Sequence, residues 1–331
     1  MRVAVVGATG YAGQEAVQWI RRHPQMSLSA VVSAHEAGHS TASYFGAGSD
    51  VPGKFTAPND LSYVSCDVIF ACQAPGQLTG AMAEWIQSGV RVVDLSADFR
   101  FGQVAQYEMY YGPHQRPELI AQSVTGYADD PYMQYPAQAA IIGNPGCYPT
   151  AFFSAVGPLA RAQMITGPII VDGKSGLSGA GRAPKTHLML AEMVENVEAY
   201  NHPGQHRHTP EMENVAGRSV MFQPHYMPMA RGMELSIYLP HAAVSPAQVV
   251  AQWENFYADT PFVRIVREQD GYPRTGRVRG TNQVELGVRV DTRTDTMVLY
   301  SAIDNLAKGA ATQAIQHVNR WMGWDPAIGL W

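Results

Sequence analysis

Short apolar runs alternate with amphipathic stretches over the first half of the chain. The runs predict strands at residues 3–6, 30–33, 68–72, 90–95 and 139–143. Helical spacing predicts helices at residues 13–22 and 77–87, the first of which ends at His23-Pro24. Apolar strands that alternate with helices are typical of a parallel sheet with helices on both faces. The pattern therefore predicts an α/β fold with a Rossmann-type, doubly wound parallel sheet.

The pattern changes after residue 147, where strands begin to follow one another. Strands are predicted at residues 168–172, 219–224 and 233–239, and a hairpin joins 283–290 to 296–303. Helices are predicted at 186–200, from Ser245-Pro246 to residue 257, and at 305–322. This pattern indicates an α+β domain with a mostly antiparallel sheet. We place the last helix back on the first domain, which gives domains of 1–147 with 304–331 and of 148–303.

Composition narrows the class of protein. The chain has 331 residues, 46% hydrophobic and 15% charged, which suits a soluble globular protein with two cores. A net charge of −5 argues against a general nucleic-acid binder. Three cysteines cannot form a full disulfide set, so we expect a reducing compartment, the cytoplasm. The apolar start is too short for a signal peptide, and prolines interrupt the uncharged residues 131–160, so no membrane span is expected.

One cysteine lies where a predicted strand meets a predicted helix. Residues 143–150 read Gly-Asn-Pro-Gly-Cys-Tyr-Pro-Thr, and Pro149 suits the first turn of a helix. The positive end of a helix favours thiolate over thiol, and thiolate is the form that attacks a carbonyl carbon. Cys147 is therefore the candidate nucleophile, with a small buried core residue as the alternative. Cys66 and Cys72 flank a predicted core strand and are expected to be structural.

A glycine-rich turn follows the first predicted strand and opens the first helix. Glycines let the backbone approach a pyrophosphate, and a helix N-terminus stabilises its charge. The spacing is G-x-x-G-x-x-G rather than G-x-G-x-x-G, and a glycine turn without a ligand is the alternative. The predicted dinucleotide contacts are Gly7, Thr9, Gly10, Tyr11, Ala12 and Gly13.

The end of the second predicted strand bears on the choice of cofactor. NAD-binding proteins place an acidic residue there to hold the ribose hydroxyls. This chain has Ser33-Ala34-His35, with Glu36 one residue later. Ser33 and His35 suit a 2′-phosphate, so NADP(H) is predicted, although no arginine stands at this position.

Two histidines precede a predicted helix in the segment Gln-His-Arg-His-Thr-Pro-Glu, in which Thr209 is the expected cap. A helix N-terminus disfavours imidazolium, so a histidine there stays neutral and can act as a base. His206 is the first choice, and the choice between it and His208 stays open. Histidines of a surface loop are one alternative. A metal site of His202, His206 and His208 is another, but the spacing matches no strong zinc pattern and no metal is predicted.

Further candidates lie in two loops. The glycine-rich residues 175–182 follow the predicted strand 168–172, and such a loop can approach a nicotinamide ring or an anion, or be a mobile surface loop. Residues 94–100 follow a strand at the edge where α/β sheets bind ligands. There Arg100 can hold a phosphate or carboxylate, or form a surface ion pair. Positive charge that suits an anionic substrate comes also from Arg182, Lys185, Arg207 and Arg231.

These segments together resemble the N-acetyl-γ-glutamyl-phosphate reductases of arginine biosynthesis. The resemblance is carried, in the expected order, by residues 7–13, 94–100, 143–150, 175–182, 206–211, 224–232 and 304–310. The aspartate-semialdehyde dehydrogenases are wider relatives with the same architecture and the same cysteine and histidine chemistry. Two departures stand out. Residues 125–130 replace the Gly-Leu-Pro-Glu that is usual in the family, and Ala34 stands where arginine is common.

The resemblance implies the reduction of N-acetyl-glutamyl 5-phosphate to the 5-semialdehyde. It implies that Cys147 displaces phosphate to form a thioester, that NADPH reduces the thioester, and that His206 shuttles protons. The substrate contacts that it implies are Arg100, Arg207, His208 and Ser178. The further cofactor contacts that it implies are Ser33, Ser175, Gly176, Gly179 and Asn305.

Two other functions stay open on the sequence. One is the same chemistry on another acyl phosphate, such as aspartyl phosphate or a carrier-linked aminoadipyl phosphate. The other is a non-enzymatic NADP-binding sensor, which needs residues 7–13 but no reactive thiol. The resemblance also implies a homodimer or homotetramer, with the sheet of the second domain as the interface. No nucleic-acid or membrane partner is expected.

Overall fold

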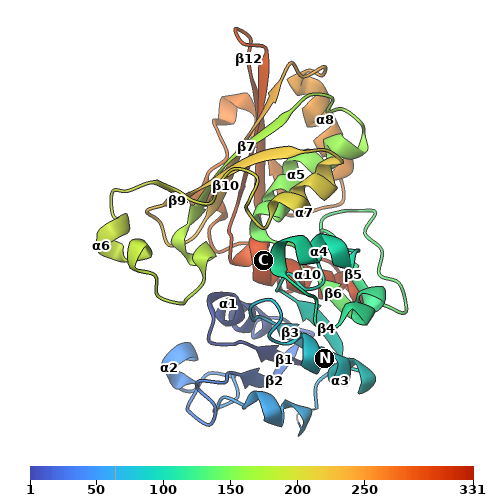
Figure 1. Ribbon diagram of the computed structural model, residues 1–331, viewed down its shortest axis with the longest axis vertical. Coiled ribbons are helices and arrows are strands. Elements are labelled where there is room, and N and C mark those ends of the chain that lie inside the picture. Colours follow the sequence, from blue (N-terminus) through green and yellow to red (C-terminus); the bar gives the residue numbers. More distant parts are fainter. Residues whose placement is uncertain (64) are drawn as a thin grey trace. The chain divides into compact units, whose positions relative to one another are not determined.

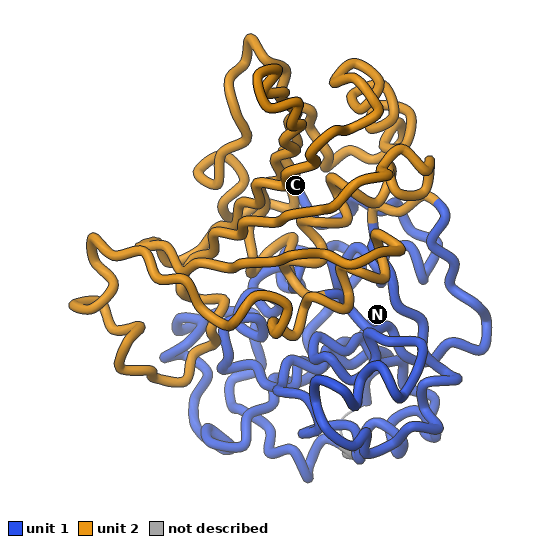
Figure 2. The backbone as a smooth tube through the Cα atoms, turned by 45° about the horizontal axis from the view of Figure 1, so that its top comes forward, with its two compact units in different colours: residues 1–128, 132–145, 310–331 blue, residues 129–131, 146–309 orange. Residues whose placement is uncertain are grey.

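The structure is a computed structural model that describes residues 1–63 and 65–331 (Figure 1). The described chain divides into two compact units (Figure 2). The first comprises Met1–Ala128, Tyr132–Pro145 and Ala310–Trp331. The second comprises Asp129–Pro131 and Gly146–Gly309.

The first unit contains a six-stranded sheet in the order β2-β1-β3-β4-β6-β5. Every pair of neighbouring strands is parallel, which confirms the predicted Rossmann-type sheet. Its central strands are buried on both faces, as expected of apolar runs between two helical layers. The strands are β1 (Arg2–Val6), β2 (Ser27–Val32), β3 (Val68–Ala71), β4 (Arg91–Asp94), β5 (Ser123–Thr125) and β6 (Ile141–Gly143).

The first helix of this unit, α1, buries an apolar stripe. In α1 this stripe consists of Ala16, Val17, Trp19 and Ile20, together with Gly13. The last predicted helix is shorter than expected, because a π-helical turn (Ala307–Ala311) precedes it and α10 begins only at Thr312. The helices are α1 (Tyr11–Ile20), α2 (Ala42–Phe45), α3 (Thr79–Gln87), α4 (Val104–Tyr111) and α10 (Thr312–Trp321).

The second unit contains a seven-stranded sheet in the order β11-β12-β13-β10-β7-β9-β8. The β7–β9 and β11–β12 pairs are parallel and the other four pairs are antiparallel, which confirms the mostly antiparallel sheet. The strands are β7 (Ile169–Gly176), β8 (Glu198–Ala199), β9 (Val220–Met227), β10 (Met233–Pro240), β11 (Val263–Ile265), β12 (Val284–Asp291) and β13 (Thr296–Ile303).

Two helices, α5 and α8, cover one face of this sheet. The indole N–H of Trp253 on α8 donates to the carbonyl of Ala155 on α5 at 2.8 Å, and Trp253 is fully buried. Ser245 forms the predicted capping box at the start of α8 with Gln248. The helices of this unit are α5 (Cys147–Arg161), α6 (Leu190–Met193), α7 (Thr209–Ala216), α8 (Pro246–Phe256) and α9 (Thr275–Val278).

Several predicted elements of the second half were wrong. Residues 186–200 form no long helix but the short turn Thr186–Leu188, α6 and β8. Of their apolar side chains Met193 is buried, but Met189, Leu190, Val194 and Val197 stay 53–77% exposed. The strand predicted at 168–172 continues to Gly176, because β10 pairs with it as far as Ser175. The residue that caps α7 is His208 rather than Thr209.

Across the described residues, no helix is both long enough and apolar enough to cross a membrane.

Candidate active site

Cys147 is the first residue of α5, and Gly146 is the N-cap of that helix. The predicted order of strand, tight turn and helix is confirmed, because β6 ends at Gly143 shortly before. The side chain of Cys147 is partly exposed rather than enclosed in the core. A solvent-accessible thiol at a helix N-terminus has the surroundings of a reactive cysteine.

The imidazole of His208 lies directly against Gly146. A Cβ atom built on Gly146 would lie 2.5 Å from Nε2 and 2.7 Å from Cε1 of His208, so only glycine leaves room for the ring. Glu211 in the first turn of α7 accepts a hydrogen bond from the Gly146 amide at 3.0 Å. The residue before the nucleophile is therefore held by α7 through one hydrogen bond and one ring contact.

His206 is buried among aromatic rings. Its centroid lies 4.9 Å from that of His208, 5.1 Å from that of Phe222 and 5.6 Å from that of Tyr148. Burial, and then the charge of Arg207, lower the pKa of His206 to about 4. Its Nδ1 accepts the backbone N–H of His208 at 3.0 Å, so the neutral ring carries its proton on Nε2. In this tautomer Nε2 can donate a hydrogen bond, and the basic nitrogen, Nδ1, is engaged with the backbone N–H of His208.

Two phenols line the same region. Tyr148 follows the nucleophile and packs edge-on against both His206 and His208. The hydroxyl of Tyr200 lies 3.4 Å from that of Tyr148. Burial raises the pKa of both phenols, so both stay protonated at neutral pH. Tyr200 was not among the predicted site residues, because its segment was expected to be a helix.

A second cluster joins residues predicted from separate segments. The Oδ1 of Asn305 accepts the Gly232 amide at 2.8 Å, and its Nδ2 donates to Oγ of Ser178 at 2.9 Å. A Cβ built on Gly179 would lie 3.0 Å from Oγ of Ser175 and 3.9 Å from Nδ2 of Asn305. The structure therefore brings together the candidates Ser175, Ser178, Gly179 and Asn305. The backbone amide of Gly176 also joins them, because it donates to the Gly232 carbonyl at 2.9 Å.

A buried carboxylate holds the turn next to this cluster. Asp304 is fully buried and accepts two hydrogen bonds from Arg231, at 2.7 and 2.9 Å. It also accepts the amides of Leu306 and Ala307 at 2.9 Å each. The charge of Arg231 is therefore neutralised within the fold. Of the other positively charged candidates, Arg182, Lys185 and Arg207 are exposed.

In the first unit, the turn after β1 is shaped for close approach. Gly7 has φ +83°, which favours glycine, and a Cβ built on it would lie 2.4 Å from the Cys72 carbonyl oxygen. A Cβ on Gly13 would lie 2.2 Å from the Gly7 carbonyl oxygen. Gly10 is the N-cap of α1, and Tyr11 and Ala12 open that helix. This cradle suits a pyrophosphate at a helix N-terminus.

The end of β2 completes this region. The hydroxyls of Thr9 and Ser33 lie 3.3 Å apart, so the structure brings these two candidates together. The carboxylate of Glu36 accepts the hydroxyl of Tyr44 at 3.0 Å and lies 3.3 Å from Nδ1 of His39. The only acidic residue near the end of β2 in the sequence is thus engaged within its own loop.

Arg100 is anchored at the carboxyl end of β4. Its Nε donates to the Asn144 carbonyl at 2.8 Å and its Nη2 to the Leu95 carbonyl at 2.9 Å. Beneath it, burial and then the charge of Asp98 raise the pKa of Asp94 to about 7. Asp94 accepts the hydroxyl of Ser96 at 2.8 Å, which fixes the loop that carries Arg100.

The other two cysteines differ from Cys147 in their surroundings. Burial raises the pKa of both Cys66 and Cys72, so these thiols stay protonated at neutral pH. Among the described residues, no three His, Cys, Asp or Glu side chains are arranged to hold a metal ion.

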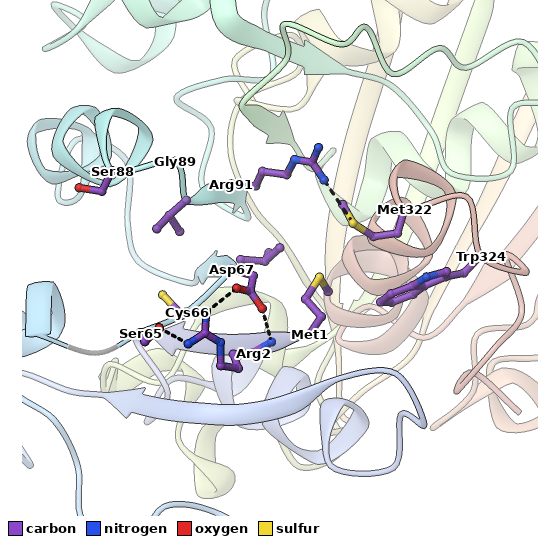
Figure 3. Close-up of a pocket in the computed structure, with 12 residues that line it drawn as sticks. Met1, Arg2, Ser65, Cys66, Asp67, Ser88, Gly89, Arg91, Met322 and Trp324 are labelled. Carbon is purple, nitrogen blue, oxygen red and sulfur yellow. Dashed lines mark hydrogen bonds and ion pairs between the residues drawn. The ribbon is translucent and has the colours of Figure 1, made fainter.

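A separate cavity of about 590 Å³ lies at the amino ends of β1, β3 and β4 (Figure 3). Its Arg2 pairs with Asp67 at 2.8 Å and donates to Ser65, and its Arg91 donates to Met322. This cavity contains none of the candidate residues, which in the first unit lie at the carboxyl ends of the strands.

Comparison with known proteins gives two family matches. "Semialdehyde dehydrogenase, NAD binding domain" matches residues 2–147, and "Semialdehyde dehydrogenase, dimerisation domain" matches residues 147–305. An N-acetyl-gamma-glutamyl-phosphate reductase of Symbiobacterium thermophilum is 40% identical over all of this chain and 97% of its own length. The reductase of Halorhodospira halophila is 38% identical over all of this chain and 98% of its own.

Solved structures show the same fold at low identity. Aspartate semialdehyde dehydrogenase II of Vibrio cholerae, complexed with ASA, has a TM-score of 0.71 and 18% identity, over 97% of this chain and 98% of its own. Aspartate semialdehyde dehydrogenase of Candida albicans, with NADP, has a TM-score of 0.70 and 15% identity, over 97% and 99%.

Proposed function

The chain belongs to the N-acetyl-γ-glutamyl-phosphate reductase family, and on that premise we propose that it reduces N-acetyl-glutamyl 5-phosphate to N-acetyl-glutamate 5-semialdehyde with NADPH. The resemblance carried by the sequence motifs is confirmed by relatives that are 36–40% identical along the whole chain. The structural observation that supports this activity most directly is the accessible thiol of Cys147 at the start of α5, with a histidine ring against the preceding glycine.

The chemistry at Cys147 is nucleophilic. The thiolate attacks the acyl carbon, a C–S bond forms, the C–O bond to phosphate breaks, and inorganic phosphate leaves. The product of this step is a thioester on the enzyme. A bound NADPH supplies the hydride that reduces the thioester carbonyl. Breaking the C–S bond then releases the semialdehyde, and the sulfur of Cys147 takes up a proton and returns as the thiol.

Proton transfer is assigned to His208. Its Nε2 lies against the residue that precedes the nucleophile, whereas Nδ1 of His206 is occupied by a backbone amide. His208 therefore accepts the proton of the Cys147 thiol and later donates one to the leaving sulfur. His206 holds the backbone of His208 in place. Of the other predicted substrate contacts, Ser178, Arg100 and Arg207 keep the roles that the resemblance implies.

The glycine turn fits the pyrophosphate of a dinucleotide. A side chain at Gly7 or Gly13 would clash with neighbouring backbone, so glycine is required for this tight turn, and the amides at the start of α1 would face a pyrophosphate bound there. NADP(H) is favoured because Ser33 lies at the end of β2 while Glu36 is engaged with Tyr44 and His39. The nicotinamide end is assigned to Ser175, Gly176, Gly179 and Asn305.

One face of the seven-stranded sheet suits a second copy of the chain. Outward-facing Ile170 and Met221 are 36% and 47% exposed, while α5 and α8 cover the opposite face. Further along β7, Lys174 pairs with Asp172 at 2.7 Å and Glu234 at 3.3 Å. The name of the matching family domain, a dimerisation domain, also favours this face. We assign a cytoplasmic homodimer or homotetramer, with residues 1–147 and 304–331 binding the cofactor and 148–303 forming the interface.

The direct test is NADPH formation from N-acetyl-glutamate semialdehyde and phosphate, with Cys147→Ser as the control. We expect phosphate-dependent turnover by the wild-type enzyme and none by the variant. Faster turnover of aspartate semialdehyde would refute the substrate assignment. A non-enzymatic sensor would show equally slow alkylation of Cys147, Cys66 and Cys72 at neutral pH, whereas the proposed enzyme alkylates first at Cys147.

A further inference from the structure

Lys308 is a fully buried charge that the chemistry above does not use. Its Nζ lies 2.5 Å from Oδ2 of Asp129 and 5.9 Å from the ring centroid of Phe262. Lys308 is 0% exposed and Asp129 only 4% exposed. Burial lowers the pKa of Lys308, and the charge of Asp129 opposes that change. Two enclosed charges of this kind usually cost more free energy than an apolar pair of the same volume.

The position of Lys308 in the chain relates it to the nucleophile. It is the second residue of the π-helical turn Ala307–Ala311, which starts beside the buried carboxylate of Asp304. The next residue is Gly309, and a Cβ built on it would lie 2.7 Å from Cβ and 3.2 Å from Cα of Cys147. The backbone of this turn therefore lies directly against the nucleophile, at the one residue of the turn without a side chain.

The register of the turn decides which residue faces Cys147. A π-helical turn holds one more residue than an α-helical turn. Such turns are rare in proteins, and those that occur are often found at functional sites. A shift to the α-helical register moves Gly309 and brings Lys308 or Ala310, each with a Cβ, toward Cys147. The buried ion pair can form in only one register of the turn. If the turn shifts by one residue, the residue that faces Asp129 is no longer a lysine, and the ion pair is lost.

We propose that the Lys308–Asp129 ion pair fixes the register of this turn and so holds Gly309 against Cys147. Both are positioning residues, and neither contacts the reacting atoms. Asp129 lies within residues 125–130, where this chain departs from the pattern usual in the family. The proposal rests on Cys147 as the nucleophile of the proposed function.

The test replaces the ion pair by apolar groups of similar size in the full-length chain, as K308M/D129L. The matched control is R161M/D130L, which removes the neighbouring Arg161–Asp130 pair at 2.6 Å, whose arginine is 47% exposed. The main measurement is the rate of Cys147 alkylation by iodoacetamide, followed by mass spectrometry. Circular dichroism and thermal unfolding report folding, and steady-state kinetics report kcat and KM.

We expect K308M/D129L to fold, because apolar replacement of a buried pair is often neutral or stabilising. Its Cys147 alkylation rate changes by at least about fivefold and its kcat falls by about tenfold or more, with KM for NADPH within about twofold. The control keeps wild-type values. Wild-type alkylation and kcat in K308M/D129L overturn the proposal. Failure of K308M/D129L to fold while the control folds also overturns it, because the pair is then required for the fold itself.

Alkylation needs no substrate, so a wrong substrate assignment leaves this readout intact. In that case the semialdehyde assay fails for the wild-type enzyme as well, while the difference in Cys147 alkylation between the two double variants remains.

Discussion

Substitution of Gly146 by alanine tests the contact between His208 and the turn before the nucleophile. The φ and ψ of Gly146 are −66° and 159°, which suit alanine, so the backbone adds no strain. The nearest obstacle is the imidazole of His208. The added Cβ would lie 2.5, 2.7 and 2.8 Å from its Nε2, Cε1 and Cδ2 atoms.

The size of the effect follows from these distances. Unstrained contact between such atoms begins near about 3.5 Å, so the ring or the turn must move by about 1 Å. Overpacking of this kind costs about 1–3 kcal/mol of folding free energy. A displacement of about 1 Å in a group that must meet the nucleophile lowers the rate about 100-fold, or about 2.7 kcal/mol in the activation free energy.

The assay is kcat for phosphate-dependent NADPH formation, with NADPH affinity measured by fluorescence and folding measured by thermal unfolding. We expect a kcat about 100-fold lower with unchanged NADPH affinity. The matched control is Gly80→Ala in α3, where a Cβ meets nothing within 4 Å. Full activity in Gly146→Ala, or a loss that matches the fraction of unfolded protein, would show that His208 does not act from this position.

Three further outcomes are expected. Cys147→Ser lowers phosphate-dependent turnover by about 1,000-fold or more while NADPH affinity, measured by fluorescence, stays the same; a smaller loss contradicts a covalent intermediate. The pKa of His206 falls from 6.5 unfolded to about 4 folded, so its contribution to stability is complete above pH 6.5 and is lost as the pH falls toward 4. Urea unfolding of the wild-type protein should show a loss of about 3 kcal/mol of unfolding free energy over this pH range. The His206→Gln variant should show no such loss, which tests whether His206 causes it. Ser33→Asp lowers the ratio of kcat/KM for NADPH to that for NADH by about tenfold or more, and an unchanged ratio places the 2′-phosphate elsewhere.

The sequence predicted the elements whose apolar runs are long. The parallel strands from β1 to β6 were found except β5, whose three residues, Ser123–Thr125, form too short and too polar a run to signal a strand. The helix expected at 186–200 failed for the opposite reason. Its apolar spacing is present, but Leu190, Val194 and Val197 stay more than half exposed in the described structure, so local spacing alone did not decide the structure.

Candidate residues were easier to find than their contacts. The hydrogen bond between Asn305 and Ser178 joins positions 127 residues apart, and that between Glu211 and Gly146 joins positions 65 apart. Motif reading can name such residues one by one, but only the fold shows that they meet. The tautomer of His206 is a further example, because it depends on one backbone amide that no residue type reveals.

Glu211 also limits which amides at the start of α5 can meet a negative oxygen. The Gly146 amide is bound to Glu211, the Thr150 amide to the Gly146 carbonyl at 2.9 Å, and Pro149 has no N–H. On the proposed mechanism, the amide of Tyr148 in the first turn of α5 is a candidate donor to an oxyanion formed at Cys147. In this arrangement Glu211 orients the turn and removes a competing donor, so that the thiol and the oxyanion donors share one rigid helix end.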